Sequence, residues 1–375
     1  MKRCLLYTLC DGAFLILGLN TMVLALESTS TVASIKAETG MTEPLTIFLA
    51  VFNFIVFFVA VVGNSLVLFG TIRHDLIKMD RPSLLFLQSI AVSDVVIATS
   101  SYLIKGITLA SDHWVLGDLL CRASKVIFTT ALFNEAGVIA MLSVYRVWML
   151  KRTAARRNLI NVTIIKVVLV CFFFVGAVYL TVLMSSLNAK MFVNPHEHTC
   201  SSKIFQDPDY KIFAVLTVIV FVFVPMFIIV VSNVVTITVF LKYDHKTSHQ
   251  TVTGARSHLQ SRKSTVYLST TDPGTVQPET ASTTTETNSE YSRTILTLTA
   301  ISTMFVLSYF LIVVKNVMFL LGQGVPDWIV ITWPYLLSIN VVMNPVIYAL
   351  MNKKFKKFLK DVFMGQYSIS LITSS

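Results

Sequence analysis

Seven long apolar stretches dominate the chain, each separated from the next by a polar segment. They cover residues 46–71, 82–107, 118–149, 160–186, 211–241, 293–321 and 327–350. Each is near the length that an α-helix needs to cross roughly 30 Å of hydrocarbon. Backbone groups in lipid must be hydrogen-bonded within the protein, so a span is either a helix or a barrel strand. Residues 167–175 and 218–231 lack the alternation of barrel strands. The pattern therefore predicts an all-α membrane protein with a seven-transmembrane helix bundle.

The first residues form a different kind of apolar stretch. Lys2 and Arg3 precede a mostly apolar run that ends in Val23-Leu24-Ala25. This order is typical of a secretory signal, so we predict a signal peptide at 1–25, with an uncleaved extra helix as the alternative. Polar residues then fill an extracellular N-terminal segment at 26–45.

Charge supports the membrane assignment and orients the bundle. Only 13% of the residues are charged, whereas soluble proteins carry roughly a quarter. The net charge of +10 comes from basic residues in short connectors, which favours anionic lipid and cytosolic partners and argues against nucleic acid. Basic residues gather in alternate connectors and in the tail. They are Arg73, Lys78 and Arg81 after the first span; Lys151, Arg152, Arg156 and Arg157 after the third; Lys242, Lys246, Arg256, Arg262 and Lys263 after the fifth; and Lys353, Lys354, Lys356, Lys357 and Lys360 in the tail. The positive-inside rule then predicts a multi-pass plasma-membrane protein with its N-terminus outside.

Two polar regions lie on the predicted cytosolic side. Residues 243–292 are rich in Ser and Thr and predict a flexible third loop, either a plain linker or a target for kinases. In the final segment, 351–375, Phe355 and Phe358 alternate with lysines. That pattern predicts a short amphipathic eighth helix on the inner leaflet, followed by a cytoplasmic tail.

A set of motifs falls on these spans in a fixed order. They are Gly63-Asn64, Ala91-Val92-Ser93-Asp94, Trp114 before Cys121, Leu142-Ser143-Val144-Tyr145-Arg146, Pro225, and Asn344-Pro345-Val346-Ile347-Tyr348. Through them the chain resembles the rhodopsin-like (class A) G-protein-coupled receptors over residues 46–363. The resemblance implies a heterotrimeric G protein as partner, with a receptor kinase and arrestin as further partners. It also implies an extracellular ligand.

The resemblance assigns roles at the two ends of the third span. Cys121 and Arg146 are 25 residues apart, about 37 Å along a helix, so they reach opposite edges of the membrane. Cys200 lies in the outer loop, where a disulfide to Cys121 is feasible. Arg146 is expected to contact the G protein, and Tyr145 replaces the acid that normally restrains it, so we expect weaker restraint. Further activation residues implied by the resemblance are Phe305, Tyr309 (in place of a switch Trp), Asn344, Pro345 and Tyr348.

Two acidic residues are expected in the middle of the membrane. Asp94 and Glu135 both fall within apolar spans, where ionisable groups are costly and usually functional. The family places the matching positions together with Asn340 and Asn344, in a pocket similar to its sodium site. Two close carboxylates should share either a proton or a cation. An allosteric sodium ion is thus the one cofactor expected; the alternative is a protonated Glu135 that hydrogen-bonds its neighbours.

The ligand pocket is less specified by the sequence. Phe128 stands where amine receptors carry an Asp, so we expect a peptide or other non-amine ligand, with a peptide favoured. Lys105, Lys125 and Lys315 fall in the outer parts of their helices, where they form a cationic rim or extend to lipid headgroups. Tyr102 and Asn316 could help to line the same pocket.

Three other functions would leave different marks in the sequence. A decoy receptor, which binds ligand without activating G protein, is compatible with the altered residues Tyr145, Tyr309 and Leu311. A transporter would need inverted repeats or paired Gly/Pro breaks, which the sequence lacks. An intramembrane enzyme would need a motif such as His-Glu-x-x-His or Gly-x-Ser-x-Gly, and neither is present.

Overall fold

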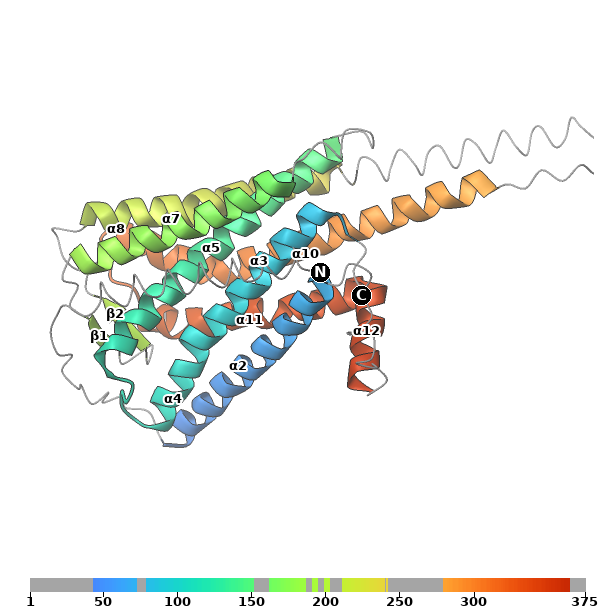
Figure 1. The fold of residues 1–375 in the computed structure, drawn as a ribbon. Helices are drawn as coiled ribbons and strands as arrows, with labels where there is room; N and C mark the ends of the chain where they lie inside the picture. The colour runs from blue at the N-terminus through green and yellow to red at the C-terminus, as the bar shows by residue number, and fades with distance from the viewer. Residues whose placement is uncertain are drawn as a thin grey trace, which may run out of the picture.

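The structure is a computed structural model that describes residues 43–72, 79–151, 162–186, 191–194, 199–202, 211–239, 241 and 279–364. Its helices run side by side as an elongated bundle (Figure 1). The elements are α2 (Glu43–Ile72), α3 (Arg81–Ile97), the π-helical η1 (Ala98–Leu103), α4 (Ile104–Ala110), α5 (Gly117–Lys151), α7 (Val162–Ser186), β1 (Met191–Asn194), β2 (Thr199–Ser202), α8 (Lys211–Val218), the π-helical η4 (Ile219–Phe223), α10 (Glu279–Leu320), α11 (Asp327–Met351) and α12 (Lys353–Phe363).

These elements make seven membrane-crossing rods. α3, η1 and α4 join into the second span, and α8 and η4 continue as a helix to complete the fifth, Val215–Val239. Within the described residues six helices are long and apolar enough to cross a membrane, and α7 adds the shorter apolar stretch Val162–Val178. The prediction of a seven-transmembrane helix bundle is confirmed.

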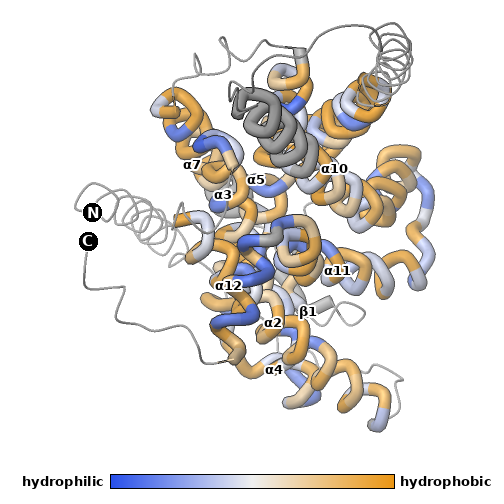
Figure 2. Tube along the Cα trace, turned by 90° about the vertical axis from the view of Figure 1, so that its right-hand side faces the viewer, coloured by the Kyte–Doolittle hydropathy of each residue, from blue (hydrophilic) through white to orange (hydrophobic). Residues whose placement is uncertain are grey.

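The bundle has its polar groups inside and many of its large apolar groups outside. Phe227 and Phe310 are 71% and 60% exposed, whereas Asp94, Glu135 and Asn340 are fully buried. Hydrophobic positions prevail along the labelled helices of the bundle when it is viewed from its end, whereas α12 also carries many hydrophilic ones (Figure 2). This arrangement suits a protein whose solvent is lipid, because an apolar surface is then in contact with acyl chains.

Close contacts fix the first span against the seventh. The Asn64 side chain donates a 2.9 Å hydrogen bond to the carbonyl of Val341. A Cβ added to Gly63 would lie 2.8 Å from Cγ of Pro345, so only glycine allows this approach. Two motif residues recognised in the sequence, Gly63 and Asn64, therefore hold α2 against the part of α11 that carries Pro345.

The eighth helix, α12, packs by one face. Phe355 and Phe358 are buried, and the Phe358 ring stacks on Phe69 with centroids 5.7 Å apart. Lys356 and Lys357 are exposed on the opposite face. Asn352 is the C-cap of α11 and the N-cap of α12. Its side chain accepts hydrogen bonds from two backbone amides of α12. The predicted amphipathic helix is present.

Some boundaries differ from the sequence prediction. Helix α10 begins at Glu279, inside the segment 243–292 that was expected to be a flexible loop, so that expectation is wrong for 279–292. Hydropathy marks only the membrane-embedded length of a helix, and polar residues can continue it into water. The rest of that loop, the predicted signal peptide 1–25, most of 26–45 and the end of the tail lie outside the described residues.

Candidate functional site

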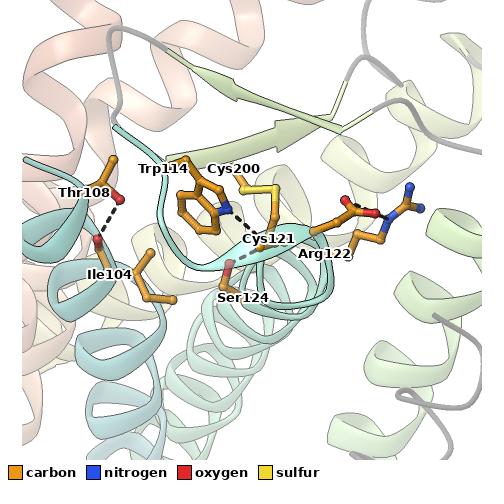
Figure 3. The surroundings of a disulfide bond; sticks show 9 residues. Ile104, Thr108, Trp114, Cys121, Arg122, Ser124 and Cys200 are labelled. Atoms are coloured by element: carbon orange, nitrogen blue, oxygen red, sulfur yellow. Dashed lines mark hydrogen bonds and ion pairs between the residues drawn. A yellow bond between two sulfur atoms is a disulfide. The ribbon is translucent and has the colours of Figure 1, made fainter. Parts of the chain in front are cut away.

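The polar residues of the bundle form three layers along α5. We call the end that carries Cys121 the outer end and the end that carries Arg146 the inner end. At the outer end, β1 and β2 form an antiparallel hairpin in which Cys200 lies opposite Val193. Cys121 and Cys200 form the disulfide, with Cα atoms 5.3 Å apart, and both are buried. The bond holds β2 against the start of α5, as Figure 3 shows.

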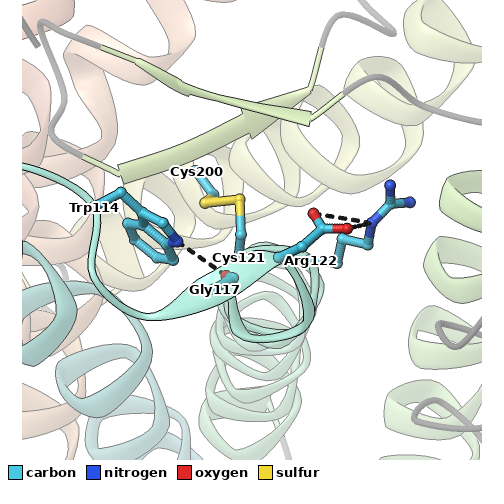
Figure 4. A network of polar contacts seen from close by, with 6 residues as sticks. Trp114, Gly117, Cys121, Arg122 and Cys200 are labelled. Atoms are coloured by element: carbon cyan, nitrogen blue, oxygen red, sulfur yellow. Dashed lines mark hydrogen bonds and ion pairs between the residues drawn. A yellow bond between two sulfur atoms is a disulfide. The ribbon is translucent and has the colours of Figure 1, made fainter. Parts of the chain in front are cut away.

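Polar contacts organise the first turns of α5 around that disulfide. Trp114 packs against the two cysteines, and its indole N–H donates a 2.9 Å hydrogen bond to the carbonyl of Gly117. Gly117 has a φ of 75°, which glycine adopts without strain and which lets the loop turn into the helix. Arg122 lies 3.3 Å from Asp118 in an ion pair one turn apart, on a side of the helix away from Trp114 (Figure 4).

An outer cavity opens beneath the hairpin. Its volume is about 20 Å³, which is room for a water molecule. Its walls come from the second and third spans, from β2 and from α11: Ser100, Ser101, Ile104, Lys105, Ser124, Lys125, Phe128, Thr199, Cys200, Trp333 and Pro334. The cavity therefore lies at the outer end of the bundle, next to the disulfide.

The predicted pocket residues take different positions around this cavity. Lys105, Lys125 and Phe128 line it. Tyr102 is behind the wall, and its hydroxyl donates a 2.8 Å hydrogen bond to the carbonyl of Pro334.

The other two predicted pocket residues lie off the cavity. The Lys315 ammonium lies 5.0 Å from the centroid of the Trp333 ring, so it touches a wall residue instead of the cavity itself. Asn316 donates to the carbonyl of Ile312 on its own helix and is not a wall residue.

The middle layer holds the two carboxylates. Glu135 Oε2 accepts a 3.1 Å hydrogen bond from the Tyr309 hydroxyl, and Oε1 accepts from the amide of Asn340. Asp94 Oδ2 accepts a 2.7 Å hydrogen bond from the amide of Asn344. The four residues grouped by the resemblance therefore lie in one buried layer, and Tyr309 of α10 joins them.

Several oxygens in this layer lack a partner. Asp94 Oδ1, the side-chain oxygens of Asn340 and Asn344, and the Tyr348 hydroxyl are all buried without a hydrogen bond to the described residues. Buried polar atoms are seldom left unpaired in native proteins. An oxygen-rich set with two carboxylates fits a hard cation such as Na⁺. No group of three or more His, Cys, Asp or Glu side chains occurs in the described parts of the chain, so the amide and hydroxyl oxygens would complete the shell.

The inner layer is built around Arg146, which is 1% exposed. Its guanidinium donates to the hydroxyls of Ser143 at 2.7 Å, Ser302 at 2.8 Å and Thr299 at 2.9 Å, and to Asn233 Oδ1 at 2.9 Å. The Ser302 hydroxyl also donates to Asn233 at 2.8 Å. Arg146 thus links the third span to the fifth and to α10.

Sequence reasoning missed Ser302 and Thr299 as partners of Arg146. The signal available was the spacing of these two hydroxyl residues, three positions apart, which places them on one face of the helix. Four uncharged acceptors stand in place of the single carboxylate, and the weaker restraint of Arg146 stays a prediction.

Tyr145 contacts a different partner from the acid that it replaces. Its hydroxyl donates a 2.7 Å hydrogen bond to Asp80 Oδ2. Asp80 is the N-cap of α3 and also accepts from the backbone amide of Ser83. Tyr145 therefore holds the third span to the start of the second, while Arg146 is bonded to its uncharged partners.

The remaining activation residues lie between the middle and inner layers. Phe305 stacks on Tyr309 with ring centroids 3.9 Å apart. Tyr348 is buried, and its ring meets Phe355 edge-on at 6.4 Å, which connects α11 to α12. Pro345 is inside α11.

Comparison with known proteins gives a consistent result. The sequence model of the 7 transmembrane receptor (rhodopsin family) matches residues 63–348. A type-1 angiotensin II receptor B of Xenopus laevis is 29% identical over 29% of this chain and 30% of its own. A melatonin receptor type 1B of Rattus norvegicus is 28% identical over 25% of each chain. The chain thus aligns with less than a third of the length of these relatives.

The fold comparison covers far more of the chain. The crystal structure of squid rhodopsin superposes with a TM-score of 0.67, covering 90% of this chain and 91% of rhodopsin at 14% identity. At that identity the match shows the fold alone. The family model, in contrast, covers most of the chain, from the last part of α2 to near the end of α11. The protein belongs to the rhodopsin family of seven-transmembrane receptors.

Proposed function

We propose that this protein is a G-protein-coupled receptor: it binds an extracellular ligand in the outer cavity and activates a heterotrimeric G protein at the inner end. The observation that carries the proposal is the buried Arg146, hydrogen-bonded to the fifth span and to α10. A buried arginine in an uncharged setting is costly and usually functional.

The hydrogen bonds around Arg146 allow α10 two positions, one bonded to Arg146 and one moved outward. Outward movement of the inner part of α10 would break the hydrogen bonds to Thr299 and Ser302 and expose the guanidinium to a cytosolic partner. A ligand or G protein that binds the moved state better would shift the equilibrium toward it. Tyr309 lies on the same helix and donates a hydrogen bond to Glu135. A movement of α10 would therefore also change the middle layer.

The ligand and the further partners follow from the same proposal. β2 of the β1–β2 hairpin forms part of the cavity wall, and a peptide is the favoured ligand. The predicted orientation places the N-terminus outside the plasma membrane, and a receptor kinase and arrestin would act on the Ser/Thr-rich segment 243–292.

We also propose an allosteric sodium ion in the middle layer. Asp94 and Glu135, with the unpaired oxygens of Asn340 and Asn344, are the residues that would hold it. The ion would offset the repulsion between two buried carboxylates and so favour the arrangement in which both stay buried.

The decisive experiment is nucleotide exchange. Purified receptor is mixed with a panel of heterotrimeric G proteins, and GDP release is measured with and without extracts that contain peptides. We expect exchange above a receptor-free control for at least one G protein, and its loss in Arg146→Ala. Receptor that binds a ligand yet leaves every G protein at control level would instead be a decoy.

A further inference from the structure

We infer that α12 is a docking surface for a membrane lipid whose headgroup carries several phosphates, such as a phosphorylated phosphatidylinositol, and that Lys356, Lys357 and Lys360 bind this headgroup. The inference rests on the part of the proposed function that places the inner end in the cytosol. It starts from the place of these lysines in the chain. The seventh span ends at Met351 and α12 begins at Lys353, so its charges lie at the level of the lipid headgroups.

The charge of α12 is strongly positive. Its sequence holds five lysines against one aspartate, which is a net charge of +4. Lys356, Lys357 and Lys360 are exposed, and none of the three forms an ion pair within the described part of the chain. A cluster of basic residues directly after a membrane span attracts anionic lipids. The three lysines are therefore free to bind phosphate groups.

The spacing of the three lysines brings their charges to one headgroup. Positions 356, 357 and 360 lie within an arc of about 100° on the helix and within about 6 Å along its axis. Each ammonium group donates charge-assisted hydrogen bonds to phosphate oxygens. Three neighbouring cations match several phosphates on one headgroup better than singly charged lipids that lie apart.

The opposite face fixes α12 to the bundle. Phe355 and Phe358 are buried, and the Phe358 ring stacks on Phe69 of α2. The helix runs across the long axis of the bundle at its inner end (Figure 1), so it lies along the membrane plane when the bundle crosses a bilayer. Because these contacts hold the helix without a lipid, little ordering is needed when a headgroup binds.

The end of α12 favours a lipid over an acidic protein as the partner. Phe363 and Met364 are 76% and 56% exposed. Phe363 follows Lys360 by three positions, so the two lie on one side of the helix. A helix in the membrane interface places such apolar side chains among acyl chains while its lysines reach the headgroups. A water-soluble acidic partner gives no such environment to Phe363.

The test measures lipid binding directly. The purified full-length receptor is titrated with phosphatidylinositol bisphosphate, with phosphatidylserine and with soluble inositol trisphosphate, and native mass spectrometry gives the bound fraction. We expect the bisphosphate lipid to bind roughly tenfold more tightly than phosphatidylserine, because several phosphates meet three lysines. Inositol trisphosphate should bind more weakly than the lipid, because it has no acyl chains.

Variants then locate the contact. Gln in place of Lys356, Lys357 and Lys360 together should weaken the affinity for the bisphosphate lipid by roughly tenfold or more. Arg at the same three positions keeps the charge and should preserve the affinity. Lys357→Gln alone should weaken it several-fold, whereas the matched control Arg81→Gln, at an exposed basic residue at the start of α3, should leave it unchanged.

Three results would overturn the inference: equal affinity for the bisphosphate lipid and phosphatidylserine, binding of inositol trisphosphate as tight as that of the lipid, or unchanged lipid affinity in the triple Gln variant. If that variant bound the lipid normally but lost nucleotide exchange in nanodiscs of phosphatidylcholine alone, the lysines would contact a protein partner instead.

The outcome for the proposed function is separate, because lipid binding is measured without any G protein. Nucleotide exchange without selective lipid binding refutes only the lipid site. Selective lipid binding by a receptor that leaves every G protein at control level refutes only G-protein activation.

Discussion

The hydroxyl of Tyr309 donates a 3.1 Å hydrogen bond to Glu135 Oε2, which joins α10 to α5 in the middle of the bundle. Both residues are buried, so the bond forms in a medium of low polarity. Tyr309 also stacks on Phe305, one turn nearer the inner end. The contact therefore couples the ionisable layer to the helix that Arg146 binds.

The first prediction concerns the charge at Glu135. In the unmodified receptor, sodium or mild acid should lower basal nucleotide exchange, because either one relieves the repulsion between Asp94 and Glu135 and stabilises the buried pair. Glu135→Gln removes one of the two charges and should flatten both dependences. Exchange is titrated with NaCl, using choline chloride to hold the ionic strength. If Glu135→Gln kept the full response to sodium and to protons, neither ion would act at this site.

The second prediction concerns the hydroxyl that ties Arg146 to α10. Ser302→Ala deletes an acceptor for the Arg146 guanidinium and a donor to Asn233. The arrangement in which α10 is bonded to Arg146 should become less stable by about 1 kcal/mol. Basal nucleotide exchange should then rise roughly fivefold. Thr303→Ala is the matched control, since Thr303 is the next residue on α10 and is exposed. Equal basal exchange in the two variants would contradict the restraint.

The third prediction concerns the hydrogen bond between Tyr145 and Asp80. Tyr145→Phe keeps the ring and removes the hydroxyl, so the purified receptor should lose about 1 kcal/mol of stability. Asp80→Asn retains an N-cap for α3 and should lose a similar amount. The double variant should cost less than the sum, since both single changes act on the same bond: Tyr145→Phe removes its donor, and Asp80→Asn makes its acceptor uncharged. Strict additivity in thermal unfolding would show that the two side chains act independently.

The fourth prediction concerns the disulfide. Cys200→Ser frees the β1–β2 hairpin from α5 and should lower the stability by about 2–4 kcal/mol. It should also abolish ligand binding in the outer cavity, because Cys200 is part of the wall. Cys171→Ser is the control, since Cys171 is a free, exposed cysteine on α7. Matching unfolding curves for Cys200→Ser and Cys171→Ser would rule out a stabilising role.

The sequence by itself determined the architecture. Lipid leaves backbone groups no external partner, so an apolar stretch of sufficient length must be a helix, and seven such stretches give the bundle. The same physics placed Asp94 and Glu135 in the membrane, and the spacing of Cys121 and Arg146 put them at opposite ends. The interleaved pattern around Phe355 predicted α12 because apolar and basic residues separate onto two faces.

Only the tertiary structure decided which side chains meet. Helical periodicity gives the face of each helix but neither its rotation nor its height against the neighbours, so the partners of Arg146 could not be read from Ser302 or Asn233 alone. The same holds for Lys105, which the sequence left undecided between the headgroups and the cavity. Its ammonium lies over the ring of Tyr335, more than two hundred residues away in the chain, and such contacts between spans are set by packing and not by local pattern.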